Sequence, residues 1–84
     1  MLDKDIEKLA DIFLKIKNKS EMVNFLYGLL TPKEIEEFSN RVDIIRLLKQ
    51  GKPQKFIAKK LGIGVATITR GSNEIKKGRF LTLK

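Results

Sequence analysis

The chain has 84 residues, a net charge of +8 and 42% apolar residues, and it contains no cysteine, histidine or tryptophan. Without thiol and imidazole groups it cannot form disulfides, use thiolate or imidazole catalysis, or build the common zinc sites, so we expect no enzyme and no metal. The N-terminus alternates charge and lacks the pattern of a signal peptide, and no apolar run reaches the roughly 18 residues of a membrane span. These features predict a cytoplasmic protein without membrane contact.

The positive charge is concentrated in the second half of the chain. Residues 1–48 contain eight Lys and Arg against nine Asp and Glu, whereas residues 49–84 contain ten Lys and Arg against a single acid, Glu74. A surface this basic attracts a polyanion, and counterion release makes nucleic acid the natural partner. From charge alone, a solvated lysine-rich surface is an equally good interpretation.

The residue pattern predicts an all-α fold of five short helices in one domain, residues 1–84. Between Asp3 and Lys17 the apolar residues recur at steps of three and four and form one helical stripe. Ser20 is a suitable N-cap for a second helix, whose apolar residues Met22, Val23, Phe25, Leu26 and Leu29 cover more than one side. So wide an apolar surface predicts cover by a second subunit as well as by the chain itself.

The third helix has the clearest start signal. Thr31-Pro32-Lys33-Glu34 places Thr at the N-cap, Pro at the first helical position and Glu where a capping box requires it. This helix is expected to end near Gln50, with Gly51 as a left-handed C-cap. Its expected core stripe is Ile35, Phe38, Val42, Ile45 and Leu48.

Two shorter helices follow. The fourth opens at Pro53, carries Phe56, Ile57 and Leu61 on its apolar face, and ends at Gly62. After Gly62-Ile63-Gly64, the fifth carries Val65, Ile68 and Ile75, and contains Gly71. A glycine inside a helix indicates either tight packing or the close approach of a ligand.

Residues 53–77 match a helix-turn-helix, in which the second helix enters the major groove of DNA. The start of the fifth helix offers hydroxyl groups for base edges and small apolar groups for thymine methyls. Lysines on the fourth helix and at the end of the fifth are placed to meet phosphates. The candidate DNA-binding residues are Gln54, Lys55, Val65, Ala66, Thr67, Thr69 and Lys76.

Three segments carry a family resemblance. Leu30-Thr31-Pro32, Arg41-Val42 and the run from Gly64 to Asn73, GVATITRGSN, resemble the tryptophan repressor family, and the similarity extends from about residue 29 to residue 77. The resemblance implies an intertwined all-helical homodimer with one helix-turn-helix per subunit. It also implies a palindromic DNA operator and L-tryptophan as corepressor. Residues 1–50 would then supply the dimerisation helices, and residues 78–84 a tail.

The resemblance also implies an effector site. It places Arg41 and Arg70 on either side of the indole ring, with Thr31 and Arg70 at the carboxylate, and the backbone around Gly28 and Leu30 at the amino group. Gly71 would give the ring room. Stacked guanidinium groups and a charge-assisted bond to a carboxylate suit this ligand. The implied effector residues are Thr31, Arg41, Arg70, Gly71, Glu74, Gly28 and Leu30.

Some positions depart from the family pattern. Glu74 stands where the family has Ser, and Gly28 where it has Leu; Glu74 can pair either with the ligand ammonium or with Arg70. The turn Gly51-Lys52-Pro53 is one residue shorter, and from residues 78–84 we expect no counterpart of the family's final helix.

Two alternatives remain. One is a regulator of the same fold with another effector or none. The other is a basic RNA-binding or nucleoid-coating module. Against it, Phe13, Phe38 and Phe56 fall on expected core stripes, so surface aromatics for base stacking are lacking.

Overall fold

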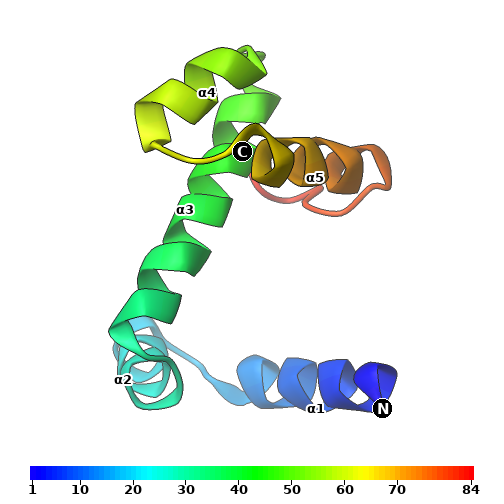
Figure 1. Ribbon diagram of the computed structural model, residues 1–84. Coiled ribbons are helices and arrows are strands. Elements are labelled where there is room, and N and C mark those ends of the chain that lie inside the picture. Colours follow the sequence, from blue (N-terminus) through cyan, green and yellow to red (C-terminus); the bar gives the residue numbers. More distant parts are fainter. The chain divides into compact units, whose positions relative to one another are not determined.

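The computed structural model describes all 84 residues and consists of five α-helices joined by short connections (Figure 1). The helices are α1 (Leu2–Lys15), α2 (Lys19–Leu29), α3 (Pro32–Lys49), α4 (Gln54–Leu61) and α5 (Val65–Lys76). The predicted all-α fold is therefore confirmed. None of the helices has the length and apolar content needed to span a membrane. The chain forms two compact units, Met1–Ile35 and Glu36–Lys84.

The first unit contains α1 and α2, and neither helix buries a single residue. The rings of Phe13 and Phe25 meet edge to face, with 5.4 Å between their centroids. Leu2, Ile6 and Tyr27 remain exposed. The apolar surface of these helices is therefore largely uncovered within the unit.

The start of α2 corrects one prediction. Its N-cap is Asn18, whose Oδ1 accepts a hydrogen bond from the backbone N–H of Glu21 at 2.9 Å. The carboxylate of Glu21 in turn accepts from the backbone N–H of Lys17 at 3.3 Å. The prediction that Ser20 caps this helix is wrong because the acid that completes a capping arrangement lies three residues after Asn18, whereas Val23 lies three residues after Ser20.

The capping box at the start of α3 is confirmed. The backbone N–H of Glu34 donates to Thr31 Oγ1 at 3.2 Å, and the backbone N–H of Thr31 donates to Glu34 Oε1 at 3.0 Å. The hydrogen bond from the Thr31 backbone, followed by the one with its side chain, lowers the pKa of Glu34. Pro32 then occupies the first helical position without losing a hydrogen bond.

The second unit holds the core. Ile44 of α3, Ile57 of α4 and Ile68 of α5 form one buried cluster, surrounded by the partly buried Leu47, Leu48, Ala58, Leu61 and Ile63. Figure 1 shows α4 and α5 beside the C-terminal half of α3. Helices α3, α4 and α5 thus meet at a single apolar centre.

The core differs from the predicted stripes at four positions. Phe38 is 47% exposed, Val42 is 40% exposed and Phe56 is 45% exposed, so the prediction that they face the core is wrong. Ile44, which lies outside the predicted α3 stripe, is one of the most deeply buried residues. The reason is that both α4 and α5 contact the C-terminal half of α3, so the buried side of this helix is turned toward Ile44 and Ile45.

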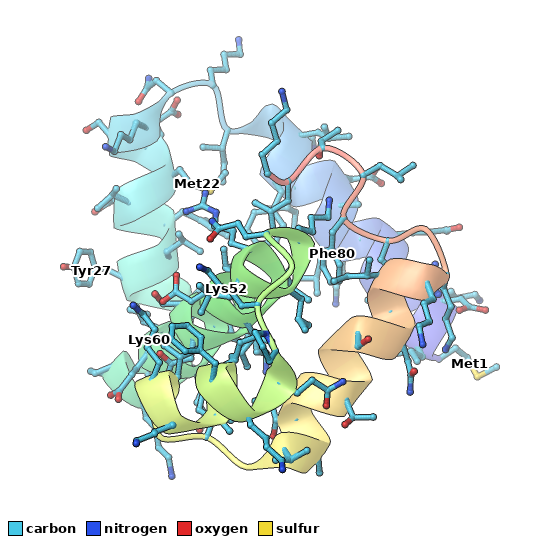
Figure 2. All side chains as sticks on the ribbon, turned by 90° about the horizontal axis from the view of Figure 1, so that it is seen from above. Met1, Met22, Tyr27, Lys52, Lys60 and Phe80 are labelled. Carbon is cyan, nitrogen blue, oxygen red and sulfur yellow. The ribbon has the colours of Figure 1, made fainter.

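The tail after α5 folds back onto the end of α3. The Nζ atom of Lys49 donates to the carbonyl oxygen of Leu83 at 2.6 Å and also to that of Phe80. Phe80, labelled in Figure 2, has a positive φ of 34°. The tail therefore belongs to the same compact unit as the three core helices.

Candidate nucleic-acid interface and effector site

The connection between α4 and α5 is short because Gly62 reverses the chain. Gly62 adopts a left-handed conformation with φ 65°, which a residue with a side chain adopts only at a cost. The backbone N–H of Ile63 donates to the carbonyl of Ala58 at 3.1 Å and closes the end of α4. Ile57 and Ile68, both 0% exposed, then fix the two helices against each other. The helical pair predicted at residues 53–77 is present.

The predicted DNA-binding residues all lie in the second unit. Gln54 is half-buried and the other six are exposed, namely Lys55, Val65, Ala66, Thr67, Thr69 and Lys76. The hydroxyl of Thr69 donates to Gln54 Oε1 at 3.1 Å, which ties the first turn of α4 to the exposed side of α5. The structure thus directly joins two residues that the sequence predicted for one surface.

The second unit carries a clear excess of positive charge, with twelve Lys and Arg against the four acids Glu36, Glu37, Asp43 and Glu74. Its basic half, residues 49–84, has Glu74 as the only acid. The Glu74 carboxylate is engaged by Arg79 Nε at 3.2 Å and by Lys77 Nζ at 3.3 Å. Hydrogen bonds from Arg79 first and Lys77 second lower the pKa of Glu74. The only acid of residues 49–84 is thereby neutralised locally, and the lysines of this segment keep an uncompensated positive field.

A hollow of about 220 Å³ lies between α3 and the start of α5. It is lined by Glu37, Asn40, Arg41, Ile44, Ile63 and Thr67. Two of these residues were predicted from the sequence, Arg41 as an effector residue and Thr67 as a base-reading residue. A molecule in this hollow would touch both at once. The Arg41 guanidinium lies over the Phe38 ring, 5.6 Å from its centroid, so it already makes a cation–π contact.

Sequence reasoning missed Glu37, Asn40 and Ile63. The one available signal is spacing, because Glu37 lies four residues before Arg41 and therefore on the same side of α3. Ile63 joins the hollow only because the turn after α4 returns to α3. No local pattern indicates that contact.

The other implied effector residues are distributed over both units. Arg70 is exposed on α5 and does not line the hollow. Gly71 packs against α3, where a Cβ atom would lie 3.1 Å from Ile45 Cδ1 and 3.3 Å from Ile44 Cγ2. Tight packing, one of the two interpretations of this glycine, therefore has structural support. Gly28, Leu30 and Thr31 belong to the first unit, where Thr31 caps α3.

Glu74 has partners other than those weighed from the sequence. Its carboxylate bonds Lys77 and Arg79, and neither bond involves Arg70. Arg70 makes no ion pair in this structure, because the two ion pairs both belong to Glu74. Arg70 therefore keeps its charge available on the exposed side of α5.

The sequence is similar to known repressors along most of its length. The profile of the family described as "Trp repressor protein" matches residues 4–80. The chain is 40% identical over 73 residues to a Trp operon repressor homolog of Vibrio vulnificus, covering 86% of this chain and 72% of that protein. It is 45% identical over 71 residues to the Trp operon repressor homolog of Aliivibrio fischeri, covering 80% of this chain and 66% of that protein.

Proposed function

Because the chain belongs to the Trp repressor family, a family of DNA-binding regulators and not of enzymes, we propose that it acts as a homodimer on a palindromic operator, with L-tryptophan as corepressor. The observation that carries the proposal is the exposed surface of α4 and α5, where the Thr69–Gln54 hydrogen bond joins two candidate contact residues within a positively charged unit. In this arrangement α5 enters the major groove, and Thr67 and Thr69 read base edges.

The lysines have a different role from the threonines. Lys55, in the first turn of α4, and Lys76, the last residue of α5, are both exposed. They pair with phosphates, which sets the register and the affinity. Each such contact releases counterions, so each contributes about 0.9 to the slope of log affinity against log salt concentration. A base contact adds about 1–3 kcal/mol of discrimination and little salt dependence.

The first experiment separates these roles. Operator and unrelated duplexes are titrated by fluorescence anisotropy at several salt concentrations. We expect Lys55→Ala and Lys76→Ala to weaken binding to both duplexes and to flatten the salt dependence, and Thr67→Ala and Thr69→Ala to weaken operator binding selectively. If Thr67→Ala weakens both duplexes equally, α5 is not the reading helix.

The proposed corepressor contacts in the second unit are Arg41, Arg70, Gly71 and Glu74. Thr31, toward the carboxylate, and the backbone near Gly28 and Leu30, toward the amino group, belong to the first unit and are proposed from the family resemblance alone. The hollow supports the contact with Arg41, because Arg41 and Thr67 line one cavity; Arg70 does not line it. A ligand there strengthens operator binding only if it binds the DNA-competent arrangement more tightly than the others. Occupancy of the hollow would therefore be sensed by the first turn of α5.

The corepressor experiment has two measurements, calorimetric titration with L-tryptophan and operator titration with and without L-tryptophan, each repeated with Arg41→Ala and Arg70→Ala. In calorimetry we expect saturable binding by the wild type. In the operator titration we expect no effect of L-tryptophan in either variant. Wild-type operator affinity that does not change with millimolar L-tryptophan would overturn the corepressor but not the DNA-binding proposal. The chain would then be a regulator of the same fold with another effector or none.

One observation favours that second candidate. Glu74 is held by Lys77 and Arg79 at the last turn of α5, and this carboxylate stands where the family pattern has a hydroxyl. Glu74→Ser separates the two cases. Tighter L-tryptophan binding in the variant means that the carboxylate opposes the ligand, and weaker binding means that Glu74 holds its ammonium group.

A further inference from the structure

An exposed aromatic ring on α4 is flanked by two ammonium groups. Phe56 is 45% exposed, Lys52 Nζ lies 5.7 Å from the centroid of its ring, and Lys60 Nζ lies 5.8 Å from it. Figure 2 shows Lys52 and Lys60 near one another beside α4. We refer to Lys52, Phe56 and Lys60 as the Phe56 platform. The Phe56 ring is not part of the core of this unit, so packing does not explain why an apolar ring lies about half exposed between two ammonium groups.

The Phe56 platform lies on a different face of α4 from the candidate reading surface. Successive residues of an α-helix are about 100° apart, so Phe56 is about 200° around the helix from Gln54. Gln54 is the residue that bonds Thr69 of α5. A duplex read by α5 and Gln54 would therefore leave the Phe56 ring outside the reading surface.

The charge around the ring selects an anionic partner. Helix α4 carries Lys55, Lys59 and Lys60 and no acidic residue. In the sequence, Asp43 and Glu74 are the nearest acids, and the Glu74 carboxylate is already engaged by Lys77 and Arg79. A ring in this field suits a ligand that combines repeated negative charge with flat apolar faces.

Single-stranded nucleic acid has both properties. A duplex hides the faces of its bases in the stack, and an acidic peptide supplies charge without a flat face. Aromatic side chains beside a basic surface are the usual means of binding unpaired bases. We propose that the Phe56 platform binds single-stranded nucleic acid, with a base stacked on Phe56 and the flanking phosphates paired with Lys52 and Lys60.

A tryptophan at position 56 gives a direct test. The natural chain contains no tryptophan, so Phe56→Trp places a single indole fluorophore on the platform of the full chain. We expect oligothymidine and oligouridine to quench its emission on binding, and a duplex of equal length to bind without quenching it. The two oligonucleotides also show whether the platform distinguishes DNA from RNA. Binding of single strands without any quenching would overturn the proposal.

Affinity measurements provide the second test. By fluorescence anisotropy, Phe56→Leu keeps an apolar side chain but removes the ring, and we expect it to weaken single-strand binding by about fivefold or more, the lower end of base–aromatic stacking. Tyr27→Leu is the matched control, because it removes a 75% exposed ring from the first unit and should change nothing. Lys60→Gln should reduce the salt slope by about 0.7, the value for one phosphate contact on a single strand.

Three other results would contradict the proposal. Equal loss of single-strand and duplex binding in Phe56→Leu would place the ring in the duplex interface. Full competition by polyglutamate at equal charge would show that an acidic protein segment is the better partner. A changed sedimentation coefficient in Phe56→Leu would show that a second copy covers the ring. Because duplex binding is measured separately, a failure of the repressor proposal leaves the single-strand test intact, and the reverse also holds.

Discussion

At Gly71 the absence of a side chain sets how closely α5 approaches α3. A Cβ atom there would lie 3.1 Å from Ile45 Cδ1, 3.3 Å from Ile44 Cγ2 and 3.6 Å from Leu48 Cδ1. Ile44 and Ile45 are 2% and 4% exposed, so their methyl groups have little space into which to move. A close-packed interior resists even one added carbon atom.

We therefore expect Gly71→Ala to destabilise the protein. Overpacking costs roughly 1–3 kcal/mol, and the higher helix propensity of Ala offsets about 1 kcal/mol of that. Gly28→Ala is the matched control, since a Cβ atom at Gly28 of α2 meets nothing within 4 Å and should raise stability by up to about 1 kcal/mol. Urea unfolding measures both changes. If Gly71→Ala stabilises the protein as Gly28→Ala does, α5 is free to move away from α3.

At Glu74 the structure predicts a pH dependence. Hydrogen bonds from Arg79 and then Lys77 lower the pKa of its carboxyl in the folded chain. A lowered pKa contributes stability above the unfolded-state pKa, which is about 4.3 for Glu, and this contribution is lost as the pH falls through the folded-state value. Glu74→Gln should therefore be less stable than the wild type at pH 7, and the difference should vanish in acid.

Thermal unfolding between pH 7 and pH 3 tests this expectation. Glu36→Gln is a suitable control because Glu36 is exposed on α3 and makes no ion pair. A stability difference for Glu74→Gln that stays constant over the whole range would mean that Arg79 and Lys77 do not hold the carboxylate in solution.

At the scale of single elements, the N-cap of α2 can be tested. Asn18→Ala removes the side-chain acceptor for the backbone N–H of Glu21 and should lower the free energy of unfolding by about 1 kcal/mol. Ser20→Ala is an internal control, because Ser20 lies inside the first turn and makes no capping bond. Denaturant unfolding gives the free energy of unfolding of both variants. A larger loss for Ser20→Ala would mean that the helix starts two residues later in solution.

Local signals in the sequence were sufficient to predict the five helices, although not the N-cap of α2. Gly51 and Gly62 end α3 and α4 at φ values of 82° and 65°, and Thr31 with Glu34 starts α3, because turns and caps depend only on neighbouring residues. The inward side of α3 was harder to predict. Ile44 is buried and Phe38 exposed because α4 and α5 pack where they do, and a three- and four-residue spacing does not contain that information.

The same distinction applies to the candidate site. The sequence predicted Gln54 and Thr69 for one surface, since the two helices of the predicted helix-turn-helix meet in a fixed way, and a hydrogen bond joins the two residues in the structure. Glu37 and Asn40 could not be assigned to the hollow from the sequence, because the residues that line it with them, Ile63 and Thr67, come from later in the chain. The Phe56 platform was missed because a phenylalanine on an apolar stripe was expected in the core.

At the scale of the whole molecule, the buried core is small for the apolar content of the chain. The buried hydrophobic residues are Ile44, Ile45, Ile57 and Ile68, all in the second unit, while α1 and α2 bury none. Chains of this length are marginally stable even when well packed. Apolar helices left this exposed require cover, and the proposed homodimer supplies it from a second copy.

A dimer that is coupled to folding makes stability depend on protein concentration. We expect sedimentation to show a dimer at micromolar concentration, and each tenfold rise in concentration to stabilise the dimer by about 1.4 kcal/mol.

A substitution on α1 then distinguishes cover by a second copy from an exposed face. Ile6 is 57% exposed in the single chain, so Ile6→Gln in a monomer should change stability by no more than about 0.5 kcal/mol. In a dimer that buries this face, the loss should approach about 1.5–3 kcal/mol for each side chain. Leu81→Gln, at a position 84% exposed in the tail, is the control for an apolar residue that stays in water. Equal and small effects of the two substitutions, together with a melting temperature that does not vary with concentration, would rule out α1 as a dimer-forming helix.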